Sequence, residues 1–242
     1  MYDSKHRMTS ASSNRANSCD NETILLSVEG NIGSGKSTLV ENLRRKFGNL
    51  QDICFLDEPV DEWEKIKDSE DKTMLEKYYA DQEKYAFSFQ MMAYISRLVR
   101  LRHAVRNNYR VIVTERSVFT DKMVFAAMLH DSGKIEDVNY AIYTRWFDEF
   151  LQDVPPIRLV YVKTDPEVAK QRVDSRARQG ETIPLEYLQN CHDYHQRWLH
   201  PKEKALDHQM LTIDGNIDII KNPKAVDEWI SEIDAFMGLS KN

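Results

Sequence analysis

The sequence predicts a doubly wound α/β domain, in which a five-stranded parallel sheet is flanked by helices. Five short runs rich in Ile, Val and Leu each end in a polar cluster, as buried parallel strands do. Helical patterns separate the runs, and such alternation is typical of a parallel sheet. A glycine-rich loop directly follows the first run, where the chain is expected to turn tightly from strand to helix.

The five predicted strands share a high content of β-branched residues and leucine, and they cover residues 24–30, 52–58, 109–116, 157–163 and 210–214. In open α/β sheets, ligands bind beyond the carboxyl ends of the strands. The polar residues at and just after these ends are therefore the candidates for a functional site.

Length and charge restrict the class of protein. The 242 residues suit one α/β domain, and a formal net charge of -6 argues against a surface that binds nucleic acid or an anionic membrane. No apolar run approaches the length of a membrane span. The three cysteines are too far apart to suggest a disulfide framework, which favours a reducing compartment.

Residues 1–22 are rich in Ser and Asn and poor in apolar residues, which predicts a disordered tail ahead of a folded domain over residues 23–242. The tail matches its basic residues with acidic ones and has no apolar centre. It therefore resembles neither a mitochondrial transit peptide nor a secretory signal peptide, and we expect a cytoplasmic protein.

The glycine-rich loop GNIGSGKST fits the pattern G-x-x-x-x-G-K-[ST]. Its residues are Gly30, Asn31, Ile32, Gly33, Ser34, Gly35, Lys36, Ser37 and Thr38. Glycines let successive backbone N–H groups turn inward around phosphate oxygens, and the following helix adds its positive N-terminal end. We expect Lys36 to reach the outer phosphates of ATP or another nucleoside triphosphate, and Ser37 to ligate Mg²⁺.

This loop does not identify the acceptor, because kinases, ATPases and GTPases share it. The chain lacks the N-K-x-D and D-x-x-G signatures of GTPases. A transport or motor ATPase usually ends a strand with an Asp for Mg²⁺, whereas the third predicted strand ends in Glu115 and Arg116. Both classes are therefore disfavoured.

Polar residues close the second and third predicted strands. At the end of the second, Glu58 suits a general base for a hydroxyl acceptor, with a surface acid before a turn as the alternative. Trp63, shortly after it, is a candidate wall for an aromatic or sugar pocket. Glu115 and Arg116 are adjacent, so one is expected on each face of the sheet. We expect Arg116 to pair with Glu58 or a phosphoryl oxygen, and Glu115 to hold Mg²⁺ or its water shell.

A basic segment follows the fourth predicted strand and contains Arg172, Arg176 and Arg178. Arginines so close together repel one another unless anions join them, and phosphoryl transfer needs such donors. We expect an arginine-rich lid that closes over the triphosphate, with a solvated basic face as the alternative.

Residues 87–97, FSFQMMAYISR, place unusual side chains on one helical face. Seven residues make two turns, so Gln90 and Arg97 lie in line with Ala93 between them. Such a face normally packs into a core, where an unpaired guanidinium is costly. An acidic partner for Arg97 is therefore expected, and Asp121, near a predicted helix start, is the candidate.

The motifs EGNIGSGKSTL, EPVDEW, FSFQ…YISR, ERSVFTD and RARQGETIPLEYL occur in the order found in deoxynucleoside kinases, which this chain resembles over about residues 24–214. The family includes deoxycytidine, deoxyguanosine and mitochondrial thymidine kinases and an insect multisubstrate enzyme. The resemblance implies a P-loop kinase fold and a homodimer. It also implies a salvage step in which the γ-phosphoryl of ATP, with Mg²⁺, passes to the 5′-hydroxyl of a deoxynucleoside.

The resemblance implies roles for individual residues. Glu58 matches the base that takes the 5′-hydroxyl proton, Arg116 the arginine beside it, and Glu115 the acid near Mg²⁺. Tyr79 and Glu181 match the pair that holds the sugar 3′-hydroxyl.

Other matched residues belong to the donor side of the site. The lid arginines of the family match Arg172, Arg176 and Arg178. The adenine-binding loop is expected near Asp214 and Asn216. Gly180 departs from the pattern, because the family often has an acid there.

On the acceptor side, Gln90 matches the glutamine that reads the base edge, with Phe89 beside it and Phe125 as an aromatic that stacks on the base. Ala93 and Arg97 occupy positions that separate the branches of the family.

Thymidine-preferring enzymes similar to the insect one have larger apolar groups at these two positions. Alanine with arginine, and Asp121 to pair with it, resembles the deoxycytidine and deoxyguanosine branch. A charged wall suits the amino groups of cytosine and adenine or the polar edge of guanine, and meets a thymine methyl group badly. We therefore expect deoxycytidine and purine deoxynucleosides to be preferred over thymidine.

Two alternatives stay open at this point. A nucleoside monophosphate kinase of the thymidylate type needs a basic group for the acceptor phosphate, and Arg97 is a candidate for that role. A regulatory protein that binds ATP as a switch needs no base-sized pocket, so Gln90 and Arg97 argue against it.

Overall fold

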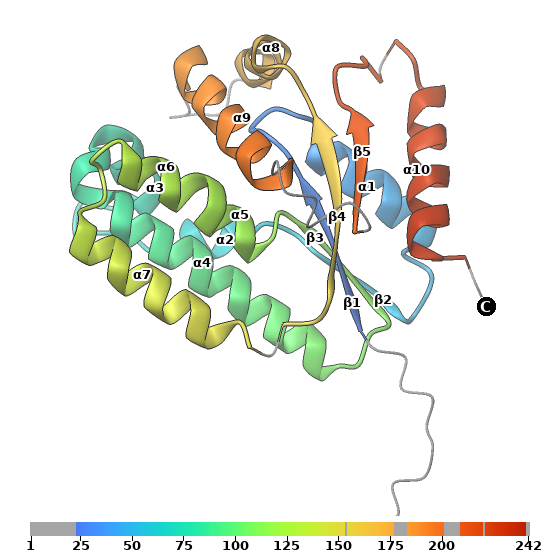
Figure 1. The fold of residues 1–242 in the computed structure, drawn as a ribbon, viewed down its shortest axis with the longest axis horizontal. Coiled ribbons are helices and arrows are strands. Elements are labelled where there is room, and N and C mark those ends of the chain that lie inside the picture. The colour runs from blue at the N-terminus through green and yellow to red at the C-terminus, as the bar shows by residue number, and fades with distance from the viewer. Residues whose placement is uncertain (1–22, 153, 177–182, 201–208, 220, 241–242) are drawn as a thin grey trace, which may run out of the picture.

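The computed structural model describes residues 23–152, 154–176, 183–200, 209–219 and 221–240. A sheet of five parallel strands, in the order β2-β3-β1-β4-β5, lies at its centre (Figure 1). The strands are β1 (Ile24–Glu29), β2 (Ile53–Leu56), β3 (Val111–Glu115), β4 (Ile157–Lys163) and β5 (Met210–Asp214). Each strand lies within a predicted run, so the predicted fold class is confirmed. The predicted tail, residues 1–22, lies outside the described residues.

Helices connect the strands. In chain order they are α1 (Lys36–Phe47), α2 (Val60–Trp63), α3 (Met74–Ala80), α4 (Gln82–Arg106), α5 (Val118–Thr120), the π-helix η1 (Asp121–Ala126), α6 (Ala127–Asp131), α7 (Asp137–Phe150), α8 (Pro166–Arg176), α9 (Leu185–Leu199) and α10 (Lys224–Met237). None of the helices in the described part of the chain is both long and apolar enough to cross a membrane.

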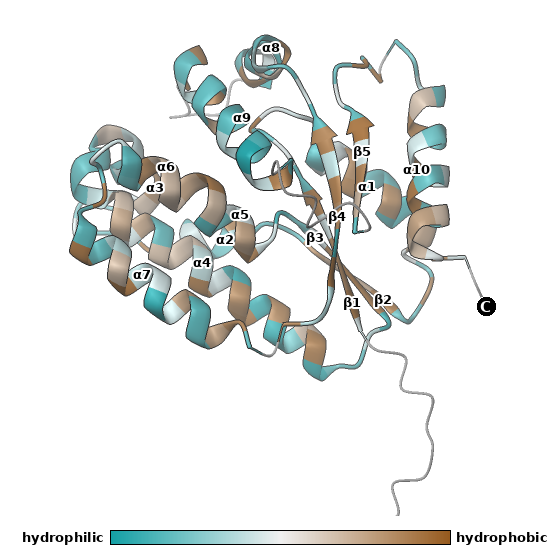
Figure 2. Ribbon diagram, in the orientation of Figure 1, coloured by the Kyte–Doolittle hydropathy of each residue, from teal (hydrophilic) through white to brown (hydrophobic). Residues whose placement is uncertain are grey.

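Helices cover both faces of the sheet, which explains why the strands are mostly apolar (Figure 2). On one face, Leu26 and Val28 of β1 pack in a cluster with side chains of α1 and α10. On the other, Leu25 packs with Ile112 of β3 and Leu101 of α4. Successive strand residues thus serve opposite layers, as the pleat requires.

The long helix α4 brings polar side chains into the interior. It begins at Asp81, whose side chain accepts a hydrogen bond from the backbone N–H of Lys84. Its buried residues include Gln90, Ala93 and Arg97, so the predicted polar face is confirmed as an inward face.

The segment after β3 turns sharply towards α4. Arg116 has a left-handed backbone conformation, with φ of 62°. The short helix α5 then leads into the wide π-helical turn η1, whose first residue, Asp121, is buried. Such π-turns are frequent at functional sites because they displace side chains from ordinary helical positions.

Candidate active site

A cavity of about 740 Å³ lies beyond the carboxyl ends of the strands, where ligands of open α/β sheets bind. Most of the predicted site residues line it. They are Ile32, Gly33, Ser34, Gly35, Lys36, Ser37, Thr38, Glu58, Trp63, Tyr79, Phe89, Gln90, Ala93, Arg97, Glu115, Arg116, Asp121, Phe125, Arg172 and Arg176. The structure therefore brings residues from across the chain to one site.

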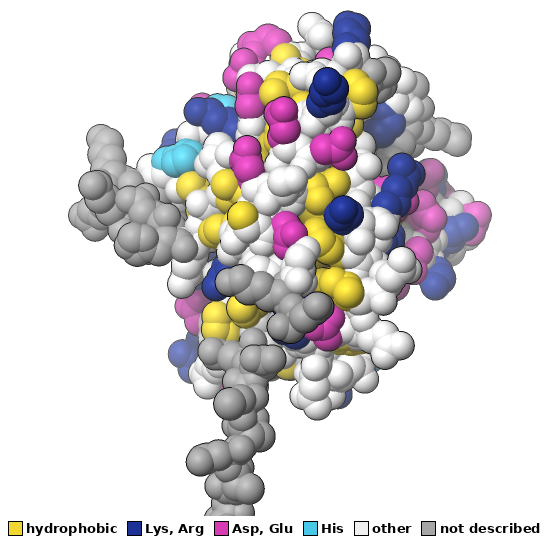
Figure 3. Space-filling view, turned by 90° about the vertical axis from the view of Figure 1, so that its right-hand side faces the viewer, with side chains coloured by type: hydrophobic (Ala, Val, Ile, Leu, Met, Phe, Trp, Pro, Cys, Tyr) yellow, Lys and Arg dark blue, Asp and Glu magenta, His cyan; other side chains and the backbone are white. Residues whose placement is uncertain are grey.

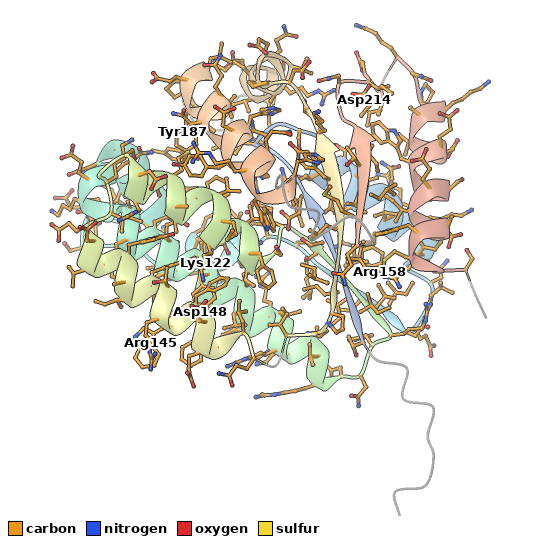
Figure 4. All side chains as sticks on the ribbon, in the orientation of Figure 1. Lys122, Arg145, Asp148, Arg158, Tyr187 and Asp214 are labelled. Carbon is orange, nitrogen blue, oxygen red and sulfur yellow. The ribbon has the colours of Figure 1, made fainter. Side chains whose placement is uncertain are left out.

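Four predicted residues do not line the cavity. Gly30 and Asn31 lie behind the loop, where the side chain of Asn31 donates to the carbonyl of Leu188 at 2.8 Å. Asp214, at the end of β5 (Figure 4), accepts from the backbone N–H of Asn216 at 3.0 Å. These contacts shape the loops, and a role of these four residues in holding the cofactor stays a prediction.

The cavity wall near the end of β5 is mostly apolar. Gly215, Ile217 and Ile219 line it after the strand, and Trp229 lines it from α10. Gly215 lies within the predicted adenine-binding loop, whereas sequence reasoning did not single out Ile217, Ile219 or Trp229, because no motif marks them. The lid residues Arg178 and Glu181 lie outside the described residues, and so does Gly180.

The phosphate-binding loop depends on glycine conformations. Gly33 has φ of 77°, and a Cβ atom there would lie 2.5 Å from the carbonyl oxygen of Ala169. Gly35 has φ of 99° and directly precedes α1. These left-handed residues curl the loop so that the N-terminus of α1 faces the cavity, which suits phosphate oxygens.

Lys36 is buried at the floor of this loop. Its ammonium donates to the carbonyl oxygen of Asn31 at 2.6 Å. Burial, together with the nearby positive charge of Arg116, lowers the pKa of Lys36 to about 7. The negative charges of Glu115, Glu58 and Glu29 oppose this shift but do not cancel it. The ammonium itself donates to neutral oxygens of Asn31 and Ser34, so a phosphate oxygen would be a stronger partner.

Ser37 and Glu115 present oxygen atoms side by side at the cavity. The Ser37 hydroxyl donates to Oε1 of Glu115 at 2.9 Å. Hydroxyl and carboxylate oxygens are the ligand type that Mg²⁺ prefers. The two predicted metal ligands are therefore close enough to act on one ion.

Arg97 joins three elements at the inner end of the cavity. Its Nε donates to Oδ2 of Asp121 at 3.0 Å, as predicted, and its Nη1 donates to the backbone carbonyl of Glu115 at 2.9 Å. Its Nη2 also donates to Oε1 of Glu58 at 3.1 Å. The same carboxylate oxygen accepts from Nη1 of Arg116 at 3.0 Å, which confirms the predicted pairing of Glu58 with Arg116.

These contacts affect the protonation of both Glu58 and Asp121. Burial alone would raise the pKa of Glu58, but the positive charges of Arg116, Arg97 and Lys36 outweigh it and hold the pKa at about 2. Burial raises the pKa of Asp121 to about 6, despite the opposing effect of Arg97. Glu58 is thus a carboxylate at neutral pH, stabilised by two guanidinium groups.

Glu115 and Arg116 do not point to opposite faces, which corrects the prediction from strand alternation. Both line the same cavity. The pleat ends at Glu115, and the left-handed conformation of Arg116 turns its side chain back towards Glu58. Alternation holds only while the backbone stays extended.

An aromatic slot forms the middle of the cavity. Phe89 stacks on Tyr78, with ring centroids 4.5 Å apart, and meets Trp63 edge to face at 5.6 Å. Gln90 is 2% exposed, and its Oε1 has no hydrogen-bond partner within the described structure. A buried amide oxygen without a partner is costly unless a ligand satisfies it. Phe125 also lines the cavity, and the guanidinium of Arg116 lies over its ring, 5.5 Å from the centroid.

Sequence reasoning missed two tyrosines of this slot. Tyr78 on α3 and Tyr187 on α9 (Figure 4) both line the cavity, with their hydroxyl oxygens 3.2 Å apart. Burial raises the pKa of Tyr78 to about 12, so its hydroxyl stays protonated. The only signals were the Tyr-Tyr pair that contains Tyr79 and the position of Tyr187 inside a motif.

Arg172 connects two loops on the side of the cavity where the nucleoside triphosphate is expected to bind. Its guanidinium donates to the carbonyl oxygens of Gly215 at 2.7 Å, Ile217 at 3.2 Å and Ser34 at 3.3 Å. This contact ties the phosphate-binding loop to the segment after β5. The residue predicted as a lid arginine therefore also holds the floor of the cavity.

Comparison with known proteins agrees with this geometry. The chain is 34% identical over 217 residues to a probable deoxycytidine kinase of fowlpox virus, covering 88% of this chain and 87% of the viral protein. It is 32% identical over 244 residues to deoxycytidine kinase 2 of Gallus gallus, covering 88% and 89%. It is also 35% identical over 178 residues to mitochondrial thymidine kinase 2 of Macaca fascicularis, covering 72% and 64%.

A sequence profile of the deoxynucleoside kinases matches residues 26–238, which include all of the sheet except the first two residues of β1. Residues of the motifs that carried the resemblance line one cavity, which contains both the phosphate-binding loop and the aromatic slot. The chain therefore belongs to the deoxynucleoside kinase family.

Proposed function

We propose that this kinase uses ATP and Mg²⁺ and prefers deoxycytidine and purine deoxynucleosides over thymidine. The proposal rests on the open amide oxygen of Gln90 next to the Arg97–Asp121 ion pair, in one cavity. An amide both donates and accepts, so it can match a base edge. The buried ion pair offers hydrogen-bond partners to the amino and carbonyl groups of a base. A methyl group can form no hydrogen bond with it.

The catalytic roles follow from the charges. Glu58 accepts the proton of the 5′-hydroxyl as that oxygen attacks phosphorus. Its low pKa makes it a weak base while both arginines hold it. Movement of the Arg116 guanidinium to the transferred phosphoryl group would stabilise the charge that develops there. It would also remove a cation from Glu58 and so raise the basicity of that carboxylate. Lys36 supports the outer phosphates.

The donor side fits a magnesium complex of a triphosphate. Ser37 and Glu115 would hold the ion, which neutralises phosphate charge when bound. The backbone of the glycine-rich loop would hold the phosphates, and the apolar wall around Ile217 and Trp229 would receive the base of the donor. Arg172 bonds both to the glycine-rich loop and to the segment after β5, and so fixes their relative position.

Two parts of the proposal combine a residue that lines the cavity with one outside the described residues. Tyr79 lines it and is proposed to hold the 3′-hydroxyl together with Glu181. Arg176 also lines it and is proposed to act with Arg178 as a lid over the triphosphate.

Initial rates with Mg-ATP and each of the four natural deoxynucleosides, at equal concentration, test the proposed preference. We expect deoxycytidine, deoxyadenosine and deoxyguanosine to exceed thymidine in kcat/KM. Assays with dCMP and dTMP as acceptors test the alternative of a monophosphate kinase. Arg97 already contacts two carboxylates, so it is poorly placed to hold an acceptor phosphate, and we expect little turnover of either. Thymidine as the best substrate would overturn the base preference and leave the kinase activity intact.

The pH dependence of donor binding provides a second test. Burial lowers the pKa of Lys36 to about 7 in the free protein, so its positive charge is present below that pH and lost above it. We expect kcat/KM for ATP to fall as pH rises through about 7. Bound phosphates favour the charged form, so kcat should fall only at higher pH.

Lys36→Arg is the matched control, because arginine stays charged throughout this range. ATP binding by that variant, measured by calorimetry between pH 6 and 9, should lose the decline near pH 7. An unchanged decline in the variant would assign it to another group. Glu58 does not contribute to a decline in ATP binding between pH 6 and 9, because its pKa of about 2 leaves it ionised over that range.

We further propose a homodimer formed through α7 and α4, which lie side by side (Figure 1). Every fourth residue of α7 from Val138 is an exposed apolar side chain, namely Val138, Ile142, Trp146 and Phe150. Ile95 and Val99 on α4 are also exposed. The side of the molecule near α10 differs, because its apolar side chains are interspersed with acidic and basic ones (Figure 3). A continuous apolar stripe on a helix suits packing against a second copy.

Trp146→Glu should convert the dimer to a monomer, because the indole is 47% exposed in the single chain and stacks on Phe150 at 5.8 Å. Analytical ultracentrifugation measures the change. Ile66→Glu is the control, because Ile66 is 50% exposed but lies outside the stripe. A wild-type protein that sediments as a monomer would contradict the proposal.

The cytoplasmic location expected from residues 1–22 also remains a prediction. Fractionation of cells that express the full chain should recover it with cytosolic markers, and recovery with mitochondrial markers would contradict it.

A further inference from the structure

A buried carboxylate outside the cavity holds the segment that carries the catalytic charges. Glu29 is the last residue of β1, is 0% exposed and does not line the cavity. Its Oε1 accepts from the backbone N–H of Ser117 at 3.0 Å and from the Ser117 hydroxyl at 2.6 Å. Its Oε2 accepts from the hydroxyl of Thr120. The hydroxyl of Ser27, on the same strand, also donates to Oε1 at 2.6 Å.

These contacts fasten the turn after β3 to the strand that leads into the phosphate-binding loop. Arg116 continues the sheet pairing through its backbone N–H, which donates to the carbonyl of Val28 at 3.0 Å. Ser117 then leaves the sheet and bonds to the side chain of Glu29. The turn is therefore held on both sides of Arg116, by the backbone before it and by a carboxylate after it.

The conformation of Arg116 needs such a restraint. A left-handed backbone in a residue with a large side chain is uncommon and costs free energy, so the surroundings must impose it. This conformation is what turns Arg116 towards Glu58 while Glu115 stays beside Ser37. An extended Arg116 would send the two side chains to opposite faces of the sheet.

Burying a carboxylate is costly, and its hydrogen bonds to hydroxyl and amide donors offset that cost. Apolar residues of similar size would serve the fold as well or better. A charge at this position is therefore more than a packing requirement, because three of the four hydrogen bonds that it accepts come from Ser117 and Thr120 of the turn.

We propose that Glu29 is a positioning residue of phosphoryl transfer, which fixes the turn after β3 so that Glu115 and Arg116 both face the cavity. This inference rests on the proposed roles of Glu115 and Arg116. Glu29 acts through these residues and does not touch the substrate.

Two serines provide a matched test, because each donates one hydroxyl to the same oxygen of Glu29 at 2.6 Å and only Ser117 lies on the turn. Ser117→Ala should lower kcat about tenfold, the scale of a lost hydrogen bond to a charged group, with KM for the deoxynucleoside changed less than about twofold. Ser27→Ala should leave kcat within about twofold of the wild type. Glu29→Gln should lower kcat by at least as much as Ser117→Ala.

A purely structural role predicts a different result. It predicts equal loss of melting temperature and equal kcat for the two serine variants, and this outcome would overturn the inference. The pair remains decisive even where Glu29→Gln folds poorly, because neither serine change removes the carboxylate.

Arg116→Met separates this inference from the proposed function. If Arg116→Met loses activity while Ser117→Ala and Glu29→Gln keep wild-type kcat, the catalytic role stands and the positioning role of Glu29 is overturned. If Arg116→Met keeps wild-type kcat, the role of Arg116 is wrong, and the inference built on it falls as well.

Discussion

Glu58→Gln is expected to lower kcat by about 10²- to 10⁴-fold, the range for loss of a general base. Glutamine keeps the size of the side chain but cannot accept a proton from the 5′-hydroxyl. Its amide also cannot balance the charges of Arg97 and Arg116, which both bond to Oε1 of Glu58. Because the phosphate-binding loop is untouched, KM for ATP should change little. Steady-state rates with saturating deoxycytidine and ATP measure the effect.

Glu62→Gln is the control for this change. Glu62 lies one turn further along the chain, accepts from Arg100 at 2.6 Å, and does not line the cavity. We expect its kcat within about twofold of the wild type, since a partly exposed ion pair contributes little. Near-full turnover by Glu58→Gln at saturating substrate would remove Glu58 from the mechanism. Calorimetric binding of deoxycytidine to Glu58→Gln distinguishes lost chemistry from lost binding.

Arg97→Met is expected to lower kcat/KM for deoxycytidine by about a hundredfold or more and to shift preference towards thymidine. A site built to bond polar groups discriminates strongly, and methionine removes every donor of the guanidinium. The freed space is apolar and accepts a 5-methyl group. Initial rates with deoxycytidine and thymidine at several concentrations give the ratio of the two kcat/KM values.

The single change also leaves Asp121 buried without its cation, which is expected to cost several kcal/mol of folding free energy. The double variant Arg97→Met/Asp121→Ala removes that penalty, so it should melt at a higher temperature and use thymidine better than the single variant. Arg100→Met is the control on the same helix, because Arg100 pairs with Asp61 and Glu62 outside the cavity. An unchanged ratio of deoxycytidine to thymidine in Arg97→Met would make the Arg97–Asp121 pair purely structural.

Much of the fold was predictable because its signals are local. Strands buried on both faces are mostly apolar, so the apolar runs of β1 and β4 stand out in the sequence. The glycine pattern before Lys36 requires left-handed turns and a helix N-terminus, and both are present. The Arg97–Asp121 pair was predictable because a buried guanidinium needs an acid.

The contacts that sequence reasoning missed depend on how elements are placed in space. The bond from Arg97 to Glu58 needs α4 and the end of β2 to meet at one point, and no periodicity encodes that. The conformation of Arg116 looked like ordinary strand, because arginine itself gives no signal for a left-handed backbone. Glu29 was read as part of a motif, and its contacts arise only when β1 and the turn after β3 lie side by side.

Arg97 has a further consequence for the history of such a chain. One guanidinium bonds both to Asp121 and to Glu58, the proposed general base. A lineage that replaces Arg97 to use a new nucleobase therefore loses, in the same step, one of the cations that stabilise the Glu58 carboxylate. Descendants that use a different nucleoside must pass through an intermediate with a lower kcat or acquire a compensating substitution first. The order in which mutations become fixed is thus constrained by a single side chain.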